Sequence, residues 1–101
     1  MSEAVPLHIP FEELSAFCRR YQVRELAIFG SMLRQDYRPD SDIDLLITFK
    51  PEARVTFLTL ARMQRELETL FGRKVDLVPK DGLKPGIRDH ILATAQVLYA
   101  A

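Results

Sequence analysis

Aspartates at alternate positions precede an apolar segment near the middle of the chain. The stretch GSMLRQDYRPDSDIDLL spans residues 30–46 and carries Asp40, Asp42 and Asp44. Side chains two residues apart in a strand point to the same side, roughly 6.5–7 Å apart. If Asp42 and Asp44 begin a strand, their like charges project together with no lysine beside them, and they need a cation. Carboxylate oxygens are the ligands that suit Mg²⁺ or Mn²⁺.

A further aspartate, Asp76, interrupts a second apolar segment, KVDLV at 74–78. Aspartate is depleted in strands, so the presence of Asp44 and Asp76 inside predicted strands needs an explanation. One explanation for Asp76 is that its strand is half-buried and that the aspartate lies on the solvent-exposed face. For Asp40 a turn is the simpler explanation, because RPDSD is a favourable turn sequence. Carboxylates contributed by different elements are what metal-assisted phosphoryl-transfer sites require.

Gly30 and Ser31 stand where a predicted strand ends and a short helix is expected to begin. Glycine lets the backbone approach a ligand closely, and the N–H groups at a helix N-terminus suit phosphate. Taken alone, the pair is explained more simply by an ordinary serine N-cap. Arg34 is either a bidentate partner for triphosphate oxygens or a solvated helix residue.

The elements that must position these residues alternate between helices and strands. Apolar periodicity predicts helices over 10–21, from about 55 to 71, and from near Pro85 onward. Apolar runs predict strands over 23–30, 43–49 and 74–79, the second of them buried on both faces. Residues 96–100 form either the tail of the last helix or a short edge strand. The alternation predicts an α/β fold, a small mixed sheet flanked by helices, whose strand order stays open.

Side-chain placement on the two later helices also follows from this periodicity. Arg62 and Glu66 stand four residues apart and can pair, and Gly72 suits the position just after the helix. The residues expected on the buried sides are Phe57, Leu60, Ala61, Leu67, Leu70 and Phe71 of the middle helix, and Ile87, Ile91, Leu92 and Ala95 of the last. His8 and His90 are interpreted as surface residues.

Length and composition set outer limits on the function. The 101 residues predict a single domain over 1–101, and 48% apolar residues suffice for a packed core. No apolar run approaches the ~20 residues of a membrane helix, and the first residues do not resemble a signal peptide. The single cysteine, Cys18, forms no internal disulfide, which favours the cytoplasm and a core role for its thiol. A net charge of zero argues against direct nucleic-acid binding over a broad surface.

Together, Gly30-Ser31, Asp42-x-Asp44 and the later Asp76 resemble the polymerase-beta-type nucleotidyltransferase superfamily. More closely, GSMLRQDYRPDSDIDLL and GRKVDLV resemble the minimal nucleotidyltransferase (MNT) proteins, which include antitoxins paired with HEPN-domain toxins. Members often carry Arg-Gly-Glu after the Gly-Ser turn, whereas this chain has Arg34-Gln35-Asp36. The missing glycine concerns the conformation of that loop and not the chemistry, because all three acids are present.

The resemblance implies a palm-like fold and a set of residue roles. Gly30 and Ser31 would hold the β- and γ-phosphates of ATP, with Arg34 beside them. Asp42 and Asp44 would hold Mg²⁺ or Mn²⁺, and Asp76 would complete the metal site and help activate the attacking hydroxyl. AMP would pass to a tyrosine hydroxyl of a partner HEPN toxin, with release of pyrophosphate. A hetero-oligomer with that toxin is therefore expected.

Two other functions stay open at this point. The chain could be a non-catalytic antitoxin that neutralises a toxin ribonuclease by direct binding, with a vestigial nucleotide pocket. It could also be a nucleotidyltransferase that acts on RNA or a small molecule, which the superfamily motif alone supports.

Overall fold

Helices and strands alternate along the chain. The structure is a computed structural model that describes residues 8–30 and 42–101. Its longest helix has 15 residues, and no helix within these ranges is long and apolar enough to cross a membrane. The elements are α1 (Phe11–Arg20), β1 (Val23–Phe29), β2 (Ile43–Phe49), α2 (Phe57–Phe71), β3 (Val75–Pro79), the 3₁₀ turn η2 (Lys80–Gly82), α3 (Pro85–Thr94) and β4 (Gln96–Ala100).

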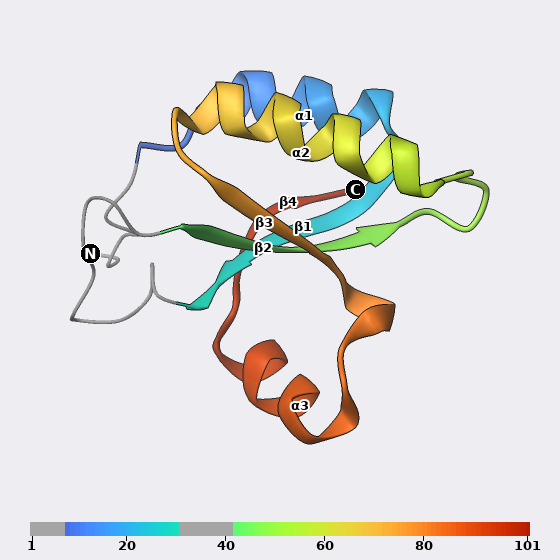
Figure 1. Ribbon diagram of the computed structural model, residues 1–101, viewed down its shortest axis with the longest axis vertical. Helices are drawn as coiled ribbons and strands as arrows, with labels where there is room; N and C mark the ends of the chain where they lie inside the picture. Colours follow the sequence, from blue (N-terminus) through green and yellow to red (C-terminus); the bar gives the residue numbers. More distant parts are fainter. Residues whose placement is uncertain (1–7, 31–41) are drawn as a thin grey trace.

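The strands form one mixed sheet in the order β3-β2-β1-β4 (Figure 1). β2 and β3 are parallel, because α2 carries the chain back between them, as a parallel pair requires. The other two pairs, β1 with β2 and β1 with β4, are antiparallel. The predicted α/β class with a small mixed sheet is confirmed, and residues 96–100 prove to be an edge strand.

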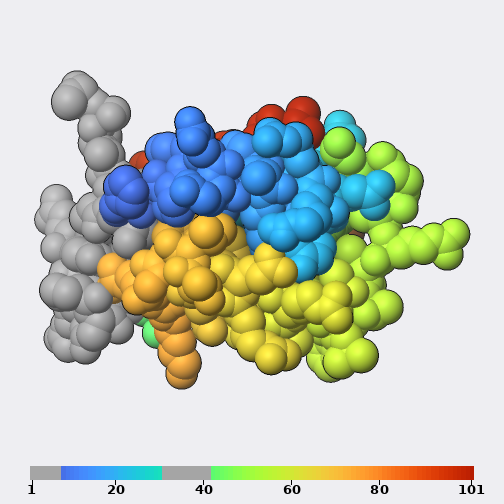
Figure 2. Space-filling view, turned by 90° about the horizontal axis from the view of Figure 1, so that it is seen from above, coloured from blue at the N-terminus to red at the C-terminus, as the bar shows by residue number. Residues whose placement is uncertain are grey.

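The helices cover the two faces of the sheet differently. α1 and α2 lie side by side over one face, as Figures 1 and 2 both show, and α3 lies beyond the other face. The main core forms under α1 and α2. Its residues alternate along β2, because alternate side chains of a strand point to the same face, whereas a register shift near Val23 interrupts the alternation in β1. Its fully or nearly fully buried members are Leu14, Phe17, Cys18, Val23, Leu26, Ile28, Ile43, Leu45, Ile47, Met63, Leu67 and Val75.

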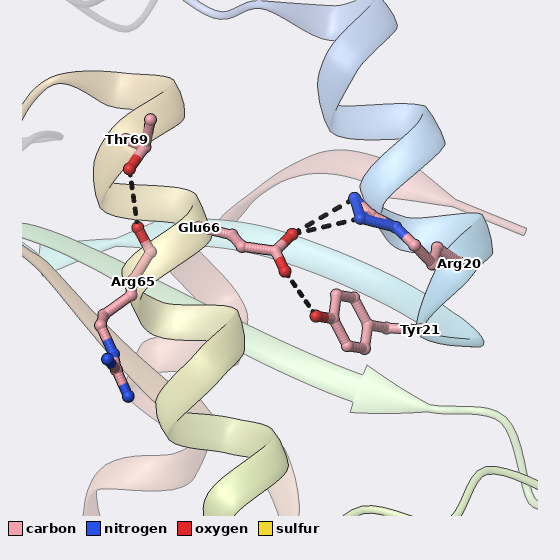
Figure 3. A network of polar contacts seen from close by, with 5 residues as sticks. All are labelled: Arg20, Tyr21, Arg65, Glu66 and Thr69. Atoms are coloured by element: carbon pink, nitrogen blue, oxygen red, sulfur yellow. Dashed lines mark hydrogen bonds and ion pairs between the residues drawn. The ribbon is translucent and has the colours of Figure 1, made fainter.

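A polar cluster joins α1 to α2 at the surface (Figure 3). The Tyr21 hydroxyl donates a hydrogen bond of 2.6 Å to Glu66 Oε2, and Arg20 lies 3.2 Å from Glu66 Oε1. Glu66, which the sequence suggests as a partner for Arg62, is thus engaged by the end of α1. Burial and the neighbouring Glu66 carboxylate raise the pKa of Tyr21. The cluster fixes the two helices relative to each other.

The buried side of α2 differs from the prediction. Met63 and Leu67 are buried, whereas Phe57 is 87% exposed and Ala61 is also exposed. Thr56 caps the helix by accepting the Thr59 N–H at 3.2 Å, so Phe57 begins the first turn. At about 100° per residue, Phe57 and Ala61 point roughly 120° and 160° away from Met63. The stripe that meets the sheet is therefore centred on Met63, which sequence reasoning left out.

The prediction that α3 turns four apolar residues inward is also wrong in part. Ile87 is 53% exposed and Leu92 is 38% exposed, while Ile91 and Ala95 are half-buried. None of the residues of α3 is fully buried. The physical reason is that two pockets lie against this helix, one lined by Ile87 and Ile91 and a smaller one lined by Leu92 and Ala95, so the helix lines these spaces rather than fills them.

The thiol of Cys18 is predicted to resist modification in the folded protein. Its side chain has no exposed surface, and burial raises its pKa from 9.0 to about 12 against the opposing effect of Arg19. The unfolded chain therefore loses the thiol proton first, so stability should fall as the pH rises from 9 towards 12. Iodoacetamide at pH 8 should label Cys18 only in step with urea unfolding, as followed by mass spectrometry. Equal labelling rates in buffer and in urea would contradict this placement.

Candidate active site

Asp44 and Asp76 lie next to each other on adjacent strands. In the parallel pair β2–β3, Ile43 is the register partner of Val75, and Asp44 is the partner of Asp76. Neighbouring strands run about 4.8 Å apart, so register partners project side by side. Ile43 and Val75 belong to the core under α1 and α2. The two aspartates therefore occupy the opposite face, on the side of α3.

Asp42 stands at the entrance to the same strand. It directly precedes β2 and is exposed, while Asp44 is half-buried. The Ile43 N–H donates a 2.9 Å hydrogen bond to the Lys74 carbonyl, which ties the first residue of β2 to the start of β3. Asp42 is thus held beside the point where the two strands first pair, two residues from Asp44.

Gly30 packs directly against the Asp44 carboxylate. It follows Phe29, the β1 residue that pairs with Asp44. Its φ of +81° is one that residues with a side chain rarely adopt, and a Cβ built there would collide with Asp44 Oδ2. The lack of a side chain at position 30 therefore leaves room for the carboxylate, and glycine also tolerates the left-handed backbone angle.

A pocket of about 450 Å³ opens from this carboxylate towards α3. Phe29, Gly30 and Asp44 line it from the sheet, and the α3 residues Ile87, His90, Ile91 and Thr94 complete the lining. His90 is exposed, as the sequence predicted, but its place in the lining of this pocket was not foreseen. Positions 87, 90, 91 and 94 follow the i, i+3, i+4, i+7 rule for one helical face, and that spacing was the available signal.

The acids fit a divalent cation that is shared with a bound ligand. Across residues 8–30 and 42–101, no three acidic, histidine or cysteine side chains converge into a closed metal cage. Mg²⁺ is commonly held by one or two carboxylates, with waters and substrate phosphates as the remaining ligands. Adjacent carboxylates from β2 and β3 offer this partial, oxygen-only ligation, and they do not suit a structural metal site of the zinc type.

Two predicted nucleotide-binding residues cannot be placed. Ser31 and Arg34, together with the short helix expected to begin at Ser31, lie outside the described residues. Their phosphate-binding roles therefore stay predictions.

Removing one charge of the adjacent pair should stabilise the metal-free protein. Like charges on neighbouring strands destabilise a sheet by roughly 0.2–1 kcal/mol. The variant Asp76→Asn should therefore unfold a few degrees higher than wild type in EDTA, as expected for a domain of ~100 residues. Thermal unfolding followed by circular dichroism measures this, with Asp81→Asn in η2 as the control that should not shift. A lower unfolding temperature for Asp76→Asn would show that the carboxylate is held by favourable contacts instead.

Comparison with known families places this geometry among related proteins. Residues 12–98 match the family described as nucleotidyltransferase domain. The protein adenylyltransferase MntA of Thermococcus cleftensis is 41% identical over 80 residues, which cover 79% of this chain and 77% of that relative.

Solved structures agree with the sequence match. A structure described as a minimal nucleotidyltransferase is 37% identical, with a TM-score of 0.65 over 87% of this chain and 95% of that one. A toxin–antitoxin structure with AMP-PNP shares the fold at 15% identity, with a TM-score of 0.73 over 92% of this chain and 75% of that chain. The palm-like fold expected from the sequence is thereby confirmed. With a domain match over residues 12–98 and a relative at 41% identity of which it covers 77%, the chain belongs to the nucleotidyltransferase domain family, among its minimal, MntA-like members.

Proposed function

We propose that this protein is a metal-dependent protein adenylyltransferase that acts as an antitoxin. It would transfer AMP from ATP to a tyrosine hydroxyl of a partner HEPN-domain toxin. The relative in Thermococcus cleftensis is named a protein adenylyltransferase. A solved structure that shares the fold holds a tri-AMPylated HEPN toxin of Shewanella oneidensis in complex with an MNT antitoxin. These names support the reaction and the kind of partner.

The observation that carries the proposal is the register match of Asp44, which lines the pocket, with the exposed Asp76 on the next strand. Two adjacent carboxylates repel each other and do not stabilise the sheet. Together with the glycine packed against one of them, they are suited to bind a metal ion and phosphate groups. Phosphoryl transfer needs positioning and charge neutralisation more than covalent participation by the protein.

Each residue has a definite task in this reaction. The Gly30 backbone allows the β- and γ-phosphates to approach closely, with Ser31 and Arg34 as further predicted partners. Asp76 accepts the proton of the tyrosine hydroxyl. The phenolic oxygen then bonds to the α-phosphorus, and the bond from that phosphorus to the bridging oxygen breaks. Pyrophosphate leaves, and AMP stays on the tyrosine as a phosphodiester.

Asp42, Asp44 and Asp76 would hold the divalent cation, Mg²⁺ or Mn²⁺. When bound, the cation neutralises charge on the triphosphate. Charge balance supports its presence, because carboxylates and phosphates repel each other and a cation between them offsets that repulsion.

Label transfer tests the proposal directly. The protein is incubated with Mg²⁺, the HEPN-type protein that co-purifies from its host, and ATP labelled at the α-phosphate. Wild type should label the partner protein, whereas Asp42→Asn/Asp44→Asn should not. ATP labelled at the γ-phosphate should leave the partner unlabelled, which separates adenylylation from phosphorylation.

Other outcomes would replace the proposal by a competing function. Label that appears on RNA or a small molecule would make the chain a nucleotidyltransferase of another substrate class. A double variant that still neutralises the toxin as well as wild type would favour an antitoxin that acts by binding alone.

A further inference from the structure

We propose that the face of α3 that lines the pocket binds the nucleoside of the nucleotide substrate, with Ile87 and Ile91 as an apolar wall and His90 as its polar contact. This inference rests on the proposed function, because it takes the phosphate end of the ligand to lie at Gly30 and Asp44. It assigns the other end of the same ligand to a helix that carries none of the predicted catalytic residues.

The pocket has two chemically different ends. Gly30 and Asp44 supply backbone and carboxylate groups, and these lie on the sheet. Phe29 lies on the sheet as well, as the register partner of Asp44. On the α3 side, Ile87 and Ile91 supply apolar surface, and His90 and Thr94 supply polar groups. A ligand that spans the pocket would therefore meet a carboxylate at the sheet, and apolar side chains with a few polar groups at α3. A nucleoside triphosphate with its bound cation fits this arrangement.

The exposure of Ile87 supports a ligand at this place. The side chain is 53% exposed and lines the pocket, so its apolar surface is available to a ligand there. Small-molecule sites are typically 300–1,000 Å³ in volume, mostly apolar, with a few polar groups that fix orientation. A pocket of about 450 Å³ that contains His90 and Thr94 among apolar residues has these properties.

His90 is the side chain suited to set orientation. It precedes Ile91 on the helix, and its imidazole can donate or accept a hydrogen bond. The polar edge of a base and the ribose hydroxyls are partners of the matching kind. A residue that contacts the nucleoside and not the reacting phosphorus would change affinity and choice of nucleotide.

The neighbouring Leu92 provides a matched control. It is also an exposed apolar residue of α3, but it lines a separate hollow of about 60 Å³ with residues such as Leu46 and Val97. That volume is too small for a nucleoside. Ile91 and Leu92 therefore allow the same truncation on the same helix, inside and outside the proposed site.

Binding of two probes by calorimetry in the presence of Mg²⁺ tests the assignment. α,β-Methylene-ATP carries both ends of the ligand, and tripolyphosphate carries the charged end alone. Ile91→Ala should weaken binding of the ATP analogue by about tenfold or more, as lost apolar contacts in a pocket do. Tripolyphosphate affinity should stay unchanged, and Leu92→Ala should bind both probes as wild type does. His90→Ala, an exposed substitution that does not threaten the fold, should weaken the analogue selectively as well.

The outcomes separate this inference from the proposed function. If wild type binds the analogue better than tripolyphosphate but Ile91→Ala and His90→Ala bind it equally well, the nucleoside lies elsewhere and the inference is wrong. If wild type binds both probes with the same affinity, the nucleoside makes no contact and the inference also fails, while the phosphate site stands. If wild type binds neither probe, the proposed function itself is overturned.

Discussion

Asp44→Asn should lower the rate of AMP transfer by about a thousandfold, which corresponds to ~4 kcal/mol of transition-state stabilisation. The carboxylate lies at the pocket, beside Asp76 on the next strand and against Gly30. Asparagine keeps the shape of the side chain but removes the charge that a divalent cation requires. The loss should appear in kcat, measured with α-labelled ATP and saturating partner protein, and excess Mg²⁺ should restore little of it.

Asp81→Asn is the matched control for this prediction. Asp81 is an exposed aspartate in η2, so the same chemical change is made outside the pocket. It should transfer AMP at the wild-type rate. Circular dichroism spectra of both variants should overlay that of wild type. A rate for Asp44→Asn within threefold of wild type would remove this residue from the catalytic site.

Gly30→Ala should reduce AMP transfer by about a hundredfold or more and should also destabilise the fold. The added methyl group would collide with the Asp44 carboxylate, so the carboxylate must move away from its position at the pocket. Misplacement of a catalytic group by ~1 Å can cost about a hundredfold in rate. The left-handed backbone at φ +81° adds roughly 1–2 kcal/mol of strain for a residue with a side chain. Label transfer and urea unfolding measure the two effects separately.

Gly72→Ala separates strain from collision. Gly72 ends α2 with φ +68°, also left-handed, but a Cβ there meets no atom within 4 Å. This variant should lose a similar roughly 1–2 kcal/mol of stability through the backbone alone and should keep full activity. If Gly30→Ala lost no more activity than Gly72→Ala, the contact between Gly30 and Asp44 would have no part in the reaction.

Local sequence chemistry determined most of the element boundaries. The apolar runs at 43–49 and 75–79 became β2 and β3, the first with the predicted bounds. Gly72 ends α2 in the left-handed conformation that the sequence predicted, and Pro85 occupies the first turn of α3. These features depend on the conformational limits of single residues and on short-range periodicity, so they can be read without knowledge of the fold.

The candidate acids were also visible in the sequence, because aspartate inside an apolar strand needs an explanation. The sequence did not show, however, that these acids lie close together. Asp44 and Asp76 are 32 positions apart, and only the parallel pairing of β2 with β3 in this register makes them neighbours. A shift of one residue would have turned Asp76 to the opposite face from Asp44.

Tertiary packing alone decided which surfaces face inward. Met63 rather than Phe57 became the centre of the buried side of α2, because α2 must cover the sheet beside α1. The face of α3 with His90 gained its significance because that helix lies beyond the far face of the sheet, across a pocket from Asp44. Periodicity identifies the faces of a helix, but strand order and helix docking choose between them. Those choices come from contacts between residues distant in sequence, for which the local pattern carries no signal.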